Sequence, residues 1–424
     1  MNMTENKQEA DTLVIIGNGF DLNLGLKTSF QDYFDKNDDD NFNKEKKDFN
    51  DLLNKVLKDT TQNPNAINKK QMFGIVKNYF RDFNSTTLSF WDLYFLLLRY
   101  INENKIGTDF YKMKNWSNVE SQIKNFFTKH RINNYSMITD FDELIDTQKL
   151  QNSHQLPGKW EYNHNQIITG NQTIPVYSFI KDDFKKIILP FLLDTQNIKN
   201  ITYNELFNQL NKFEQNFSNY ISKLPEKNKY YTEYYQNKLN KISESTWYNV
   251  LTFNYTPVPT KPIYPGENRK INHVRYIHGN TEDNKNNPII IGIGSENIKP
   301  DSDIFIFTKT YRVLSESFNE YDDLIDEKVK NIIIFGHSLV EADYSYFKSI
   351  FEATHLYSSE IDLTFKYSLS YTRTRGYPDN IIPKEQLKII TELLNKYGQE
   401  LNPNDGNDLM NKMMIENRLH ITGV

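Results

Sequence analysis

The chain of 424 residues contains no cysteine. It therefore forms neither a disulfide nor a cysteine-ligated zinc cluster, and any metal would have to be held by His, Asp or Glu. Long apolar runs are missing as well, because the longest, around residues 90–101, is interrupted by Asp92 and Arg99. The first ten residues, MNMTENKQEA, are polar. We therefore expect neither a membrane span nor a secretion signal.

An excess of positive charge is also missing. The formal net charge is -5 and the isoelectric point is near 6.0, which argues against a surface that coats nucleic acid. Hydrophobic residues make up 38% and aromatic residues 14% of the chain, enough for the cores of two or three domain-sized units. The bias toward Asn, Lys, Ile and Tyr is typical of an AT-rich bacterial coding sequence and favours a bacterial cytoplasmic protein.

The most informative segment is LVIIGNGFDLNLGLKTSF, residues 13–30. Residues 13–16 suit a strand buried on both faces, and Gly17 and Gly19 allow a sharp turn with close backbone approach. The helix predicted to follow would point its N-terminus at the turn and attract an anion there. This pattern favours nucleotide binding, although many α/β proteins have the same pattern and bind nothing at this turn.

The next two hundred residues read mainly as helices. Residues 203–221 give the clearest amphipathic pattern, with apolar side chains recurring at steps of three and four. Residues 72–83 and 176–193 show similar patterns. We therefore predict that residues 1–10 form a disordered tail, that 38–245 form a mainly helical insertion, and that 11–37 with 246–424 form a nucleotide-binding core.

Strand-like runs return after the insertion. They comprise residues 247–253, 273–278, 289–292, 332–335 and 361–369. Most are short and apolar, as the strands of a buried parallel sheet are. A helix is expected over 339–355, after the turn at Gly336. The predicted fold is therefore α/β, with a Rossmann-like, mostly parallel sheet and a large helical insertion after the first strand–helix unit.

Polar segments follow four of the predicted strands. They are GNGFD at 17–21, FNYT at 253–256, IHGN at 277–280 and GHSL at 336–339. In open α/β sheets, ligands bind beyond the carboxyl ends of the strands. We therefore expect the side chains suited to a nucleotide to meet at one edge of the sheet: Asn18, Asp21, Asn254, His278 and Ser338.

These segments, together with NWSNVE at 115–120 and GHSLVEAD at 336–343, resemble the motif series of AbiH, a bacterial abortive-infection family acting in phage defence. That pattern more distantly resembles the sirtuin-like NAD-binding domain. The resemblance implies an NAD site in which Asn254 orients the ribose and His278 is catalytic. It implies cofactor-binding roles for Gly17, Gly19, Gly25, Gly336 and Ser338.

Two positions extend or depart from that pattern. Asp21 stands where sirtuins have a small hydroxyl side chain, so its carboxylate must face a ribose hydroxyl or cap the helix. Asp343 is expected to contact the nucleotide or only to begin the helix. Sirtuin deacetylases also carry a cysteine zinc module, which this chain cannot have. The resemblance therefore favours simple cleavage of NAD over deacylation.

The leading hypothesis is an antiphage effector that hydrolyses NAD, or a related nucleotide, at the nicotinamide–ribose bond without a metal. His278 would act as base and Asn254 would orient ribose or water. Glu120, four residues after Trp116, would contribute a polar or acid/base group from the insertion. Structural alternatives are a His278 bonded to nearby backbone, an Asn254 that closes a turn, and a Glu120 held in an ion pair.

Two other function classes stay open. One is a non-catalytic sensor, in which the core binds a nucleotide and the insertion recognises a phage component. The other is a nuclease with a divalent metal held by Asp21, Glu120 and Asp343. An effector of the leading type would be toxic if always active, so we expect a phage-derived trigger or assembly into a homo-oligomer.

Overall fold

The computed structural model describes most of the chain outside several gaps. The described stretches are 10–61, 69–106, 118–129, 202–261, 270–282, 287–315, 328–339, 343–379, 381–401 and 408–424, with single positions and short strands elsewhere. The chain divides into two compact units. The first takes in 1–33, 218–297 and 308–424, and the second takes in 34–217 and 298–307.

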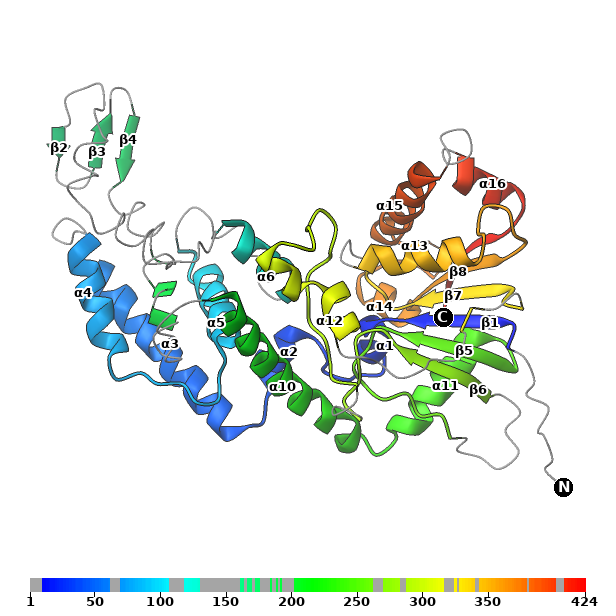
Figure 1. Ribbon diagram of the computed structural model, residues 1–424, viewed down its shortest axis with the longest axis horizontal. Helices are drawn as coiled ribbons and strands as arrows, with labels where there is room; N and C mark the ends of the chain where they lie inside the picture. The colour runs from blue at the N-terminus through cyan, green and yellow to red at the C-terminus, as the bar shows by residue number, and fades with distance from the viewer. Residues whose placement is uncertain are drawn as a thin grey trace. The chain divides into compact units, whose positions relative to one another are not determined.

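A six-stranded sheet forms the centre of the first unit (Figure 1). The strands are β1 (Thr12–Ile16), β5 (Trp247–Thr252), β6 (Lys270–Tyr276), β7 (Asn331–Phe335), β8 (Asp362–Tyr367) and β9 (Leu419–Gly423). Their order is β6-β5-β1-β7-β8-β9, and every pair is parallel. Counted along the chain, this is the doubly wound order 3-2-1-4-5-6. The structure thus confirms an α/β, Rossmann-like fold.

Successive side chains of β1 point to opposite faces of the sheet and pack into two hydrophobic cores, one on each face. Leu13 and Ile15 belong to the core that includes helices α13 (Tyr344–Ala353), α15 (Lys384–Glu400) and α16 (Leu409–Ile415). Val14 and Ile16 belong to the core that includes α1 (Asn18–Asn23) and α11 (Tyr231–Ser243). Helices therefore cover both faces, which explains why the central strands are continuously apolar.

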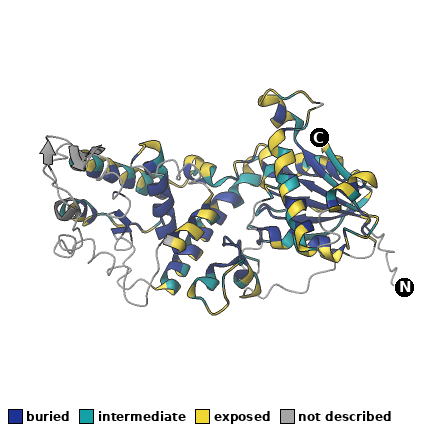
Figure 2. Cartoon of the chain, turned by 90° about the horizontal axis from the view of Figure 1, so that it is seen from above, coloured by how far each residue is buried: buried dark blue, intermediate teal, exposed yellow. Residues whose placement is uncertain are grey.

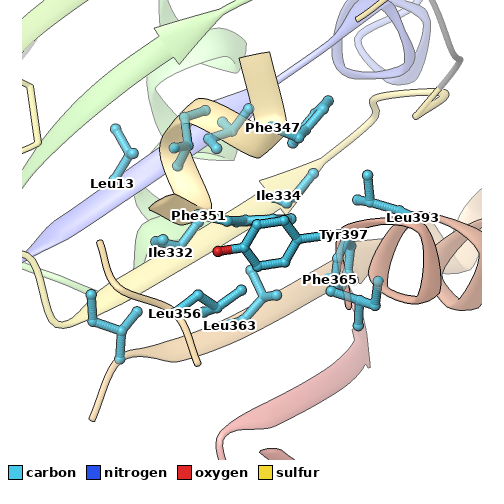
Figure 3. Close-up of a cluster of buried hydrophobic side chains, with 14 of the residues drawn as sticks. Leu13, Ile332, Ile334, Phe347, Phe351, Leu356, Leu363, Phe365, Leu393 and Tyr397 are labelled. Carbon is cyan, nitrogen blue, oxygen red and sulfur yellow. The ribbon is translucent and has the colours of Figure 1, made fainter. Parts of the chain in front are cut away.

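The first of these cores is well packed with aromatic rings (Figure 3). Phe351 of α13 and Tyr397 of α15 lie with ring centroids 5.3 Å apart, next to Leu363 of β8. The buried strands are flanked by helices with exposed outer faces (Figure 2). This packing fixes the strand ends, and with them the loops that carry the polar motifs.

Three predictions about strands need correction or refinement. Residues 289–292 were expected to form a strand, but they form an irregular segment with one β-bridge nearby, from Ile293 to Thr308. Ile289, Ile290 and Ile291 are nevertheless buried, so their apolar character reflects the core and not a strand. His278 lies two residues beyond the end of β6 and so belongs to a turn. Strand β9 was not predicted, because it is an edge strand with half-buried or exposed residues.

The second unit is mainly helical among its described residues. It contains α3 (Asp40–Thr61), α4 (Lys69–Phe80), α5 (Phe90–Glu103), α6 (Val119–Lys129) and most of α10 (Tyr203–Lys227). Its described strands, β2 (Glu161–Asn163), β3 (Gln166–Thr169) and β4 (Gln172–Pro175), form an antiparallel sheet. The helices expected at 203–221 and 72–83 are confirmed, while most of 176–193 lies outside the described residues.

Helix α5 shows how the second unit is held together. Ser89 and Asp92 form a capping box at its start, and the Trp91 indole donates to the Leu206 carbonyl of α10 at 3.0 Å. Helix α11, although inside the predicted range 38–245, packs on the sheet of the first unit. Among the described helices, none is long and apolar enough to cross a membrane.

Candidate functional site

The glycine turn after β1 meets the turn after β7, where the strand order of the sheet reverses. Gly17 donates its amide to the Phe335 carbonyl at 3.2 Å, and Gly19 donates to the Gly336 carbonyl at 2.7 Å. A Cβ atom at Gly17 would lie 2.7 Å from the His337 Cα, and one at Gly19 would lie 2.7 Å from the Gly336 oxygen. Both glycines are therefore required for the close approach of two backbones.

This contact limits how the turn would hold a phosphate. The amide of Gly19 is engaged, and the Phe20 amide donates to the Gly17 carbonyl at 2.8 Å. Helix α1 has only six residues, so its N-terminal dipole is short. The glycines predicted to bind the nucleotide therefore have a structural role that accounts for them without a ligand.

Three further predicted binding residues lie at the surface. Asn18 is exposed and its side-chain oxygen accepts from the Thr28 hydroxyl at 2.5 Å. Gly25 is exposed with φ of +81°, a left-handed conformation that suits glycine after a helix. Ser338 is exposed in the turn after β7. These exposed positions contrast with the buried polar side chains at the same edge, which are Asp21, Asn254, His278 and Asp343.

Asp21 is the first of those buried groups, with 1% of its surface exposed. One carboxylate oxygen, Oδ2, accepts the Thr256 hydroxyl at 2.7 Å. The other, Oδ1, has no hydrogen-bond partner in the described part of the chain. Burial raises the pKa of Asp21 to about 7, against the opposing effects of Thr256 and the neighbouring Asn254. The group is thus poised between its neutral and charged forms near neutral pH.

Asn254 lies beside this carboxyl group, at the end of β5. Its backbone amide donates to the Thr252 hydroxyl at 3.0 Å, which fixes the start of the loop. The side chain is 3% exposed, and neither its oxygen nor its nitrogen has a hydrogen-bond partner among the described residues. Asn254 therefore does not close a turn with its side chain, which was its structural alternative.

His278 belongs to a second group of polar residues, which we call the buried charge cluster: Asp343, Lys309, His278 and His337. The Asp343 Oδ1 atom accepts from Lys309 Nζ at 2.6 Å and lies 3.2 Å from His278 Nε2. Its Oδ2 atom lies 3.4 Å from His337 Nε2. All four side chains are less than a tenth exposed. One cation and one anion are therefore paired inside the protein.

The cluster sets the protonation of its members. Burial and the positive charge of Lys309 lower the pKa of His278 to about 4, against the effect of Asp343. Lys309 and the two histidines hold the pKa of Asp343 well below its usual range despite its burial. His278 is thus neutral at pH 7, and we assign its proton to Nε2, which faces the carboxylate. Its Nδ1 atom has no partner among the described residues and is left as an acceptor.

Phe253 links the residues of this edge. Its ring centroid lies 5.6 Å from that of His278 and 4.4 Å from that of His337, and His337 in turn packs against Gly17. The loops after β5 and β6 are also joined, because the Thr281 amide donates to the Tyr255 carbonyl at 2.9 Å. Although buried, His278 is therefore connected to the glycine turn.

The structure thus brings Asp21, Asn254, His278 and Asp343 to the carboxyl edge of one sheet. Glu120 does not belong to this unit; it is half-buried in the first turn of α6 in the second unit. Trp116 lies outside the described residues.

Sequence reasoning missed three members of the site. Thr256 and His337 lie within the motifs FNYT and GHSL, so their position after a strand was a usable signal. Lys309 carried no signal, because a lysine at the start of the short helix α12 (Lys309–Ser315) is expected to face solvent. Its burial, at 3% exposed, and its contact with Asp343 at 2.6 Å show that it belongs to the cluster.

The described residues contain no group of three His, Asp or Glu side chains arranged to hold a metal ion. Asp343, one of the ligands expected for a nuclease, is already bonded to Lys309. An ammonium group in contact with a carboxylate opposes the binding of a second cation there. The arrangement offers unpaired acceptors and an amide for an organic ligand.

Comparison with known proteins gives one match. A family model described as bacteriophage abortive infection AbiH matches residues 13–367. No curated protein and no solved structure matches the chain. The matched range includes the glycine turn, Asn254, His278 and the whole buried charge cluster.

Proposed function

Because this chain belongs to the bacteriophage abortive infection family AbiH, we propose that its role in abortive infection is carried out by hydrolysis of NAD, or of a related nucleotide, at the nicotinamide–ribose bond. The reaction would take place in the bacterial cytoplasm at the carboxyl edge of the six-stranded sheet. A phage-derived trigger or self-assembly would switch it on.

One observation carries this proposal. Three side chains at the edge, Asp21, Asn254 and His278, are at most 3% exposed and keep polar atoms without a partner among the described residues. Leaving such an atom unsatisfied costs about 1–3 kcal/mol. Three such groups beyond the strand ends of a doubly wound sheet, next to its switch point, are typical of a ligand site.

The residue types suit cleavage of an N-glycosidic bond. That reaction develops an oxocarbenium-like centre on the ribose, and water must be oriented and deprotonated nearby. The Asn254 amide would orient a ribose hydroxyl or the water. His278 Nδ1 would accept a hydrogen bond from it, and Asp343 would stabilise the imidazole if a proton were transferred.

The two pKa shifts refine which group is the base. At a pKa of about 4, His278 is neutral at pH 7 but only weakly basic. Asp21, with a pKa of about 7, matches the task of a general base more closely. We therefore propose that His278 and Asn254 orient the reacting groups and that Asp21 shares the base role predicted for His278.

The test is release of nicotinamide from NAD by purified protein, followed by chromatography, and loss of NAD in phage-infected cells, followed by mass spectrometry. We expect the variants His278→Ala and Asn254→Ala to lower release by roughly 100-fold or more. His420→Ala is the matched control, because His420 lies on the edge strand β9 and is only partly buried. Undiminished NAD in cells in which defence is active would refute hydrolysis.

The low pKa of His278 also favours a second candidate, a nucleotide-binding sensor without turnover. Calorimetric binding of NAD without nicotinamide release, together with defence that survives His278→Ala, would select this candidate. A chelator-sensitive cleavage of RNA or plasmid would instead return the metal-dependent nuclease to consideration.

A further inference from the structure

Asp21 is the polar group at this edge that the resemblance to sirtuin-like domains leaves without a role, and its contacts are unusually specific. The Thr256 hydroxyl donates to Oδ2 at 2.7 Å, while Oδ1 has no partner in the described part of the chain. The Asn254 side chain lies close enough to Asp21 to lower its pKa, although neither amide atom reaches hydrogen-bond distance and angle with a partner among the described residues. One strong acceptor thus adjoins a group that both donates and accepts.

We propose that Asp21 and Asn254 together bind the vicinal hydroxyls of a ribose, so that Asp21 determines specificity for a ligand with a free ribose diol. This inference rests on the proposed nucleotide site, whichever reaction takes place there. A diol offers two hydroxyl donors, and the Asp21 Oδ1 atom and the Asn254 amide oxygen are two acceptors without a partner among the described residues.

The polar groups around Asp21 and Asn254 do not suit a phosphate group, which is the main alternative ligand to a ribose diol. In its ionised form, which predominates above pH 7, the Asp21 carboxylate offers no donor to a phosphate and repels its charge. The amide of Gly19 is bonded to the Gly336 carbonyl at 2.7 Å and does not supply one either. The Thr256 hydroxyl already donates its hydrogen to Asp21, so it cannot donate to a phosphate. The unpaired acceptors of Asp21 and Asn254 therefore call for a ligand that supplies hydroxyl donors.

The experiment measures binding by calorimetry for NAD and for its two 2′-deoxy analogues, one modified on the adenosine ribose and the other on the nicotinamide ribose. A hydrogen bond to a charged group contributes about 1.5–3 kcal/mol, so one analogue should bind wild-type protein roughly 10- to 100-fold more weakly than NAD. In Asp21→Asn, which keeps the shape but removes the charge, that ratio should fall toward one. Thr256→Val should reduce it partly.

The matched control is Asp379→Asn, because Asp379 pairs with Arg373 at the surface. It should leave all three affinities unchanged. Circular dichroism and thermal unfolding establish that each variant is folded.

The outcomes separate this inference from the proposed reaction. Discrimination that depends on Asp21, together with undiminished NAD in infected cells in which defence is active, supports the diol site and refutes hydrolysis. Equal binding of NAD and both analogues, or discrimination that persists in Asp21→Asn, overturns the diol site while leaving hydrolysis to its own test. Failure of wild-type protein to bind NAD overturns both.

Discussion

Replacing Lys309 by methionine should strongly destabilise the first unit. The Lys309 ammonium lies 2.6 Å from Asp343 Oδ1, and the two side chains are 4% and 9% exposed. Methionine keeps much of the length of lysine but removes the charge, and leaves the carboxylate with only the longer contacts to His278 and His337, at 3.2 and 3.4 Å. Removing one partner of a buried pair costs about 3–5 kcal/mol.

The charge, and not the packing, should account for that loss. In the double variant Lys309→Met with Asp343→Asn, no charge is left unpaired, so most of the stability should return. The effect should also depend on pH. In wild-type protein the pKa of Asp343 is lowered, so its stabilising contribution is present above its unfolded value and is lost as the pH falls. In Lys309→Met the buried carboxyl takes up a proton easily, and the deficit should shrink toward pH 4.

Denaturant unfolding followed by circular dichroism measures these differences, with the transition of each unit fitted separately. The reasoning is refuted by a deficit below about 1 kcal/mol at pH 7, the value of an exposed pair. It is refuted equally by a double variant that is no more stable than Lys309→Met.

Three further predictions concern the same edge. Gly19→Ala should destabilise the protein by about 1–3 kcal/mol, because its Cβ would lie 2.7 Å from the Gly336 oxygen. The control is Gly74→Ala, in open space within α4, which should be neutral or stabilising by up to about 1 kcal/mol in the same denaturant assay. Because the pKa of Asp21 is raised to about 7, its contribution to stability is fully present below pH 4 and declines as the pH rises to 7, so unfolding of Asp21→Asn should show a flatter pH dependence; equal slopes would contradict the raised pKa. If NAD is hydrolysed, the rate should rise with a pKa near 7 that disappears in Asp21→Asn, whereas a His278 of pKa about 4 should affect the profile only under acidic conditions.

The strands nearest the site were predictable because their sequences report burial on both faces. Residues 13–16, 247–253 and 332–335 are apolar runs followed at once by Gly or Asn, and each coincides with a strand of the sheet to within a residue or two. The same rule placed Asn254 and His278 at one edge, since parallel strands end on the same side.

This inference from apolar runs to strands failed where a buried segment is not a strand, or where a strand is not buried. Residues 289–292 are as apolar as a strand but fill the core as an irregular segment, while β9 is a strand with little burial. Lys309 illustrates a different limit. Its role depends on a carboxylate 34 positions away in sequence, and no local pattern encodes that pairing.

The position of β1 has a consequence for synthesis of the protein. This strand hydrogen-bonds to β5 on one side and to β7 on the other, so its two neighbours are translated more than two hundred and three hundred residues after it. Strand β1 is therefore synthesised long before either neighbour, and it stays unpaired at least until β5, at residues 247–252, has been made. A chain that ends before β7 therefore lacks one neighbour of β1, the backbone partners of Gly17 and Gly19, and Asp343 of the buried charge cluster.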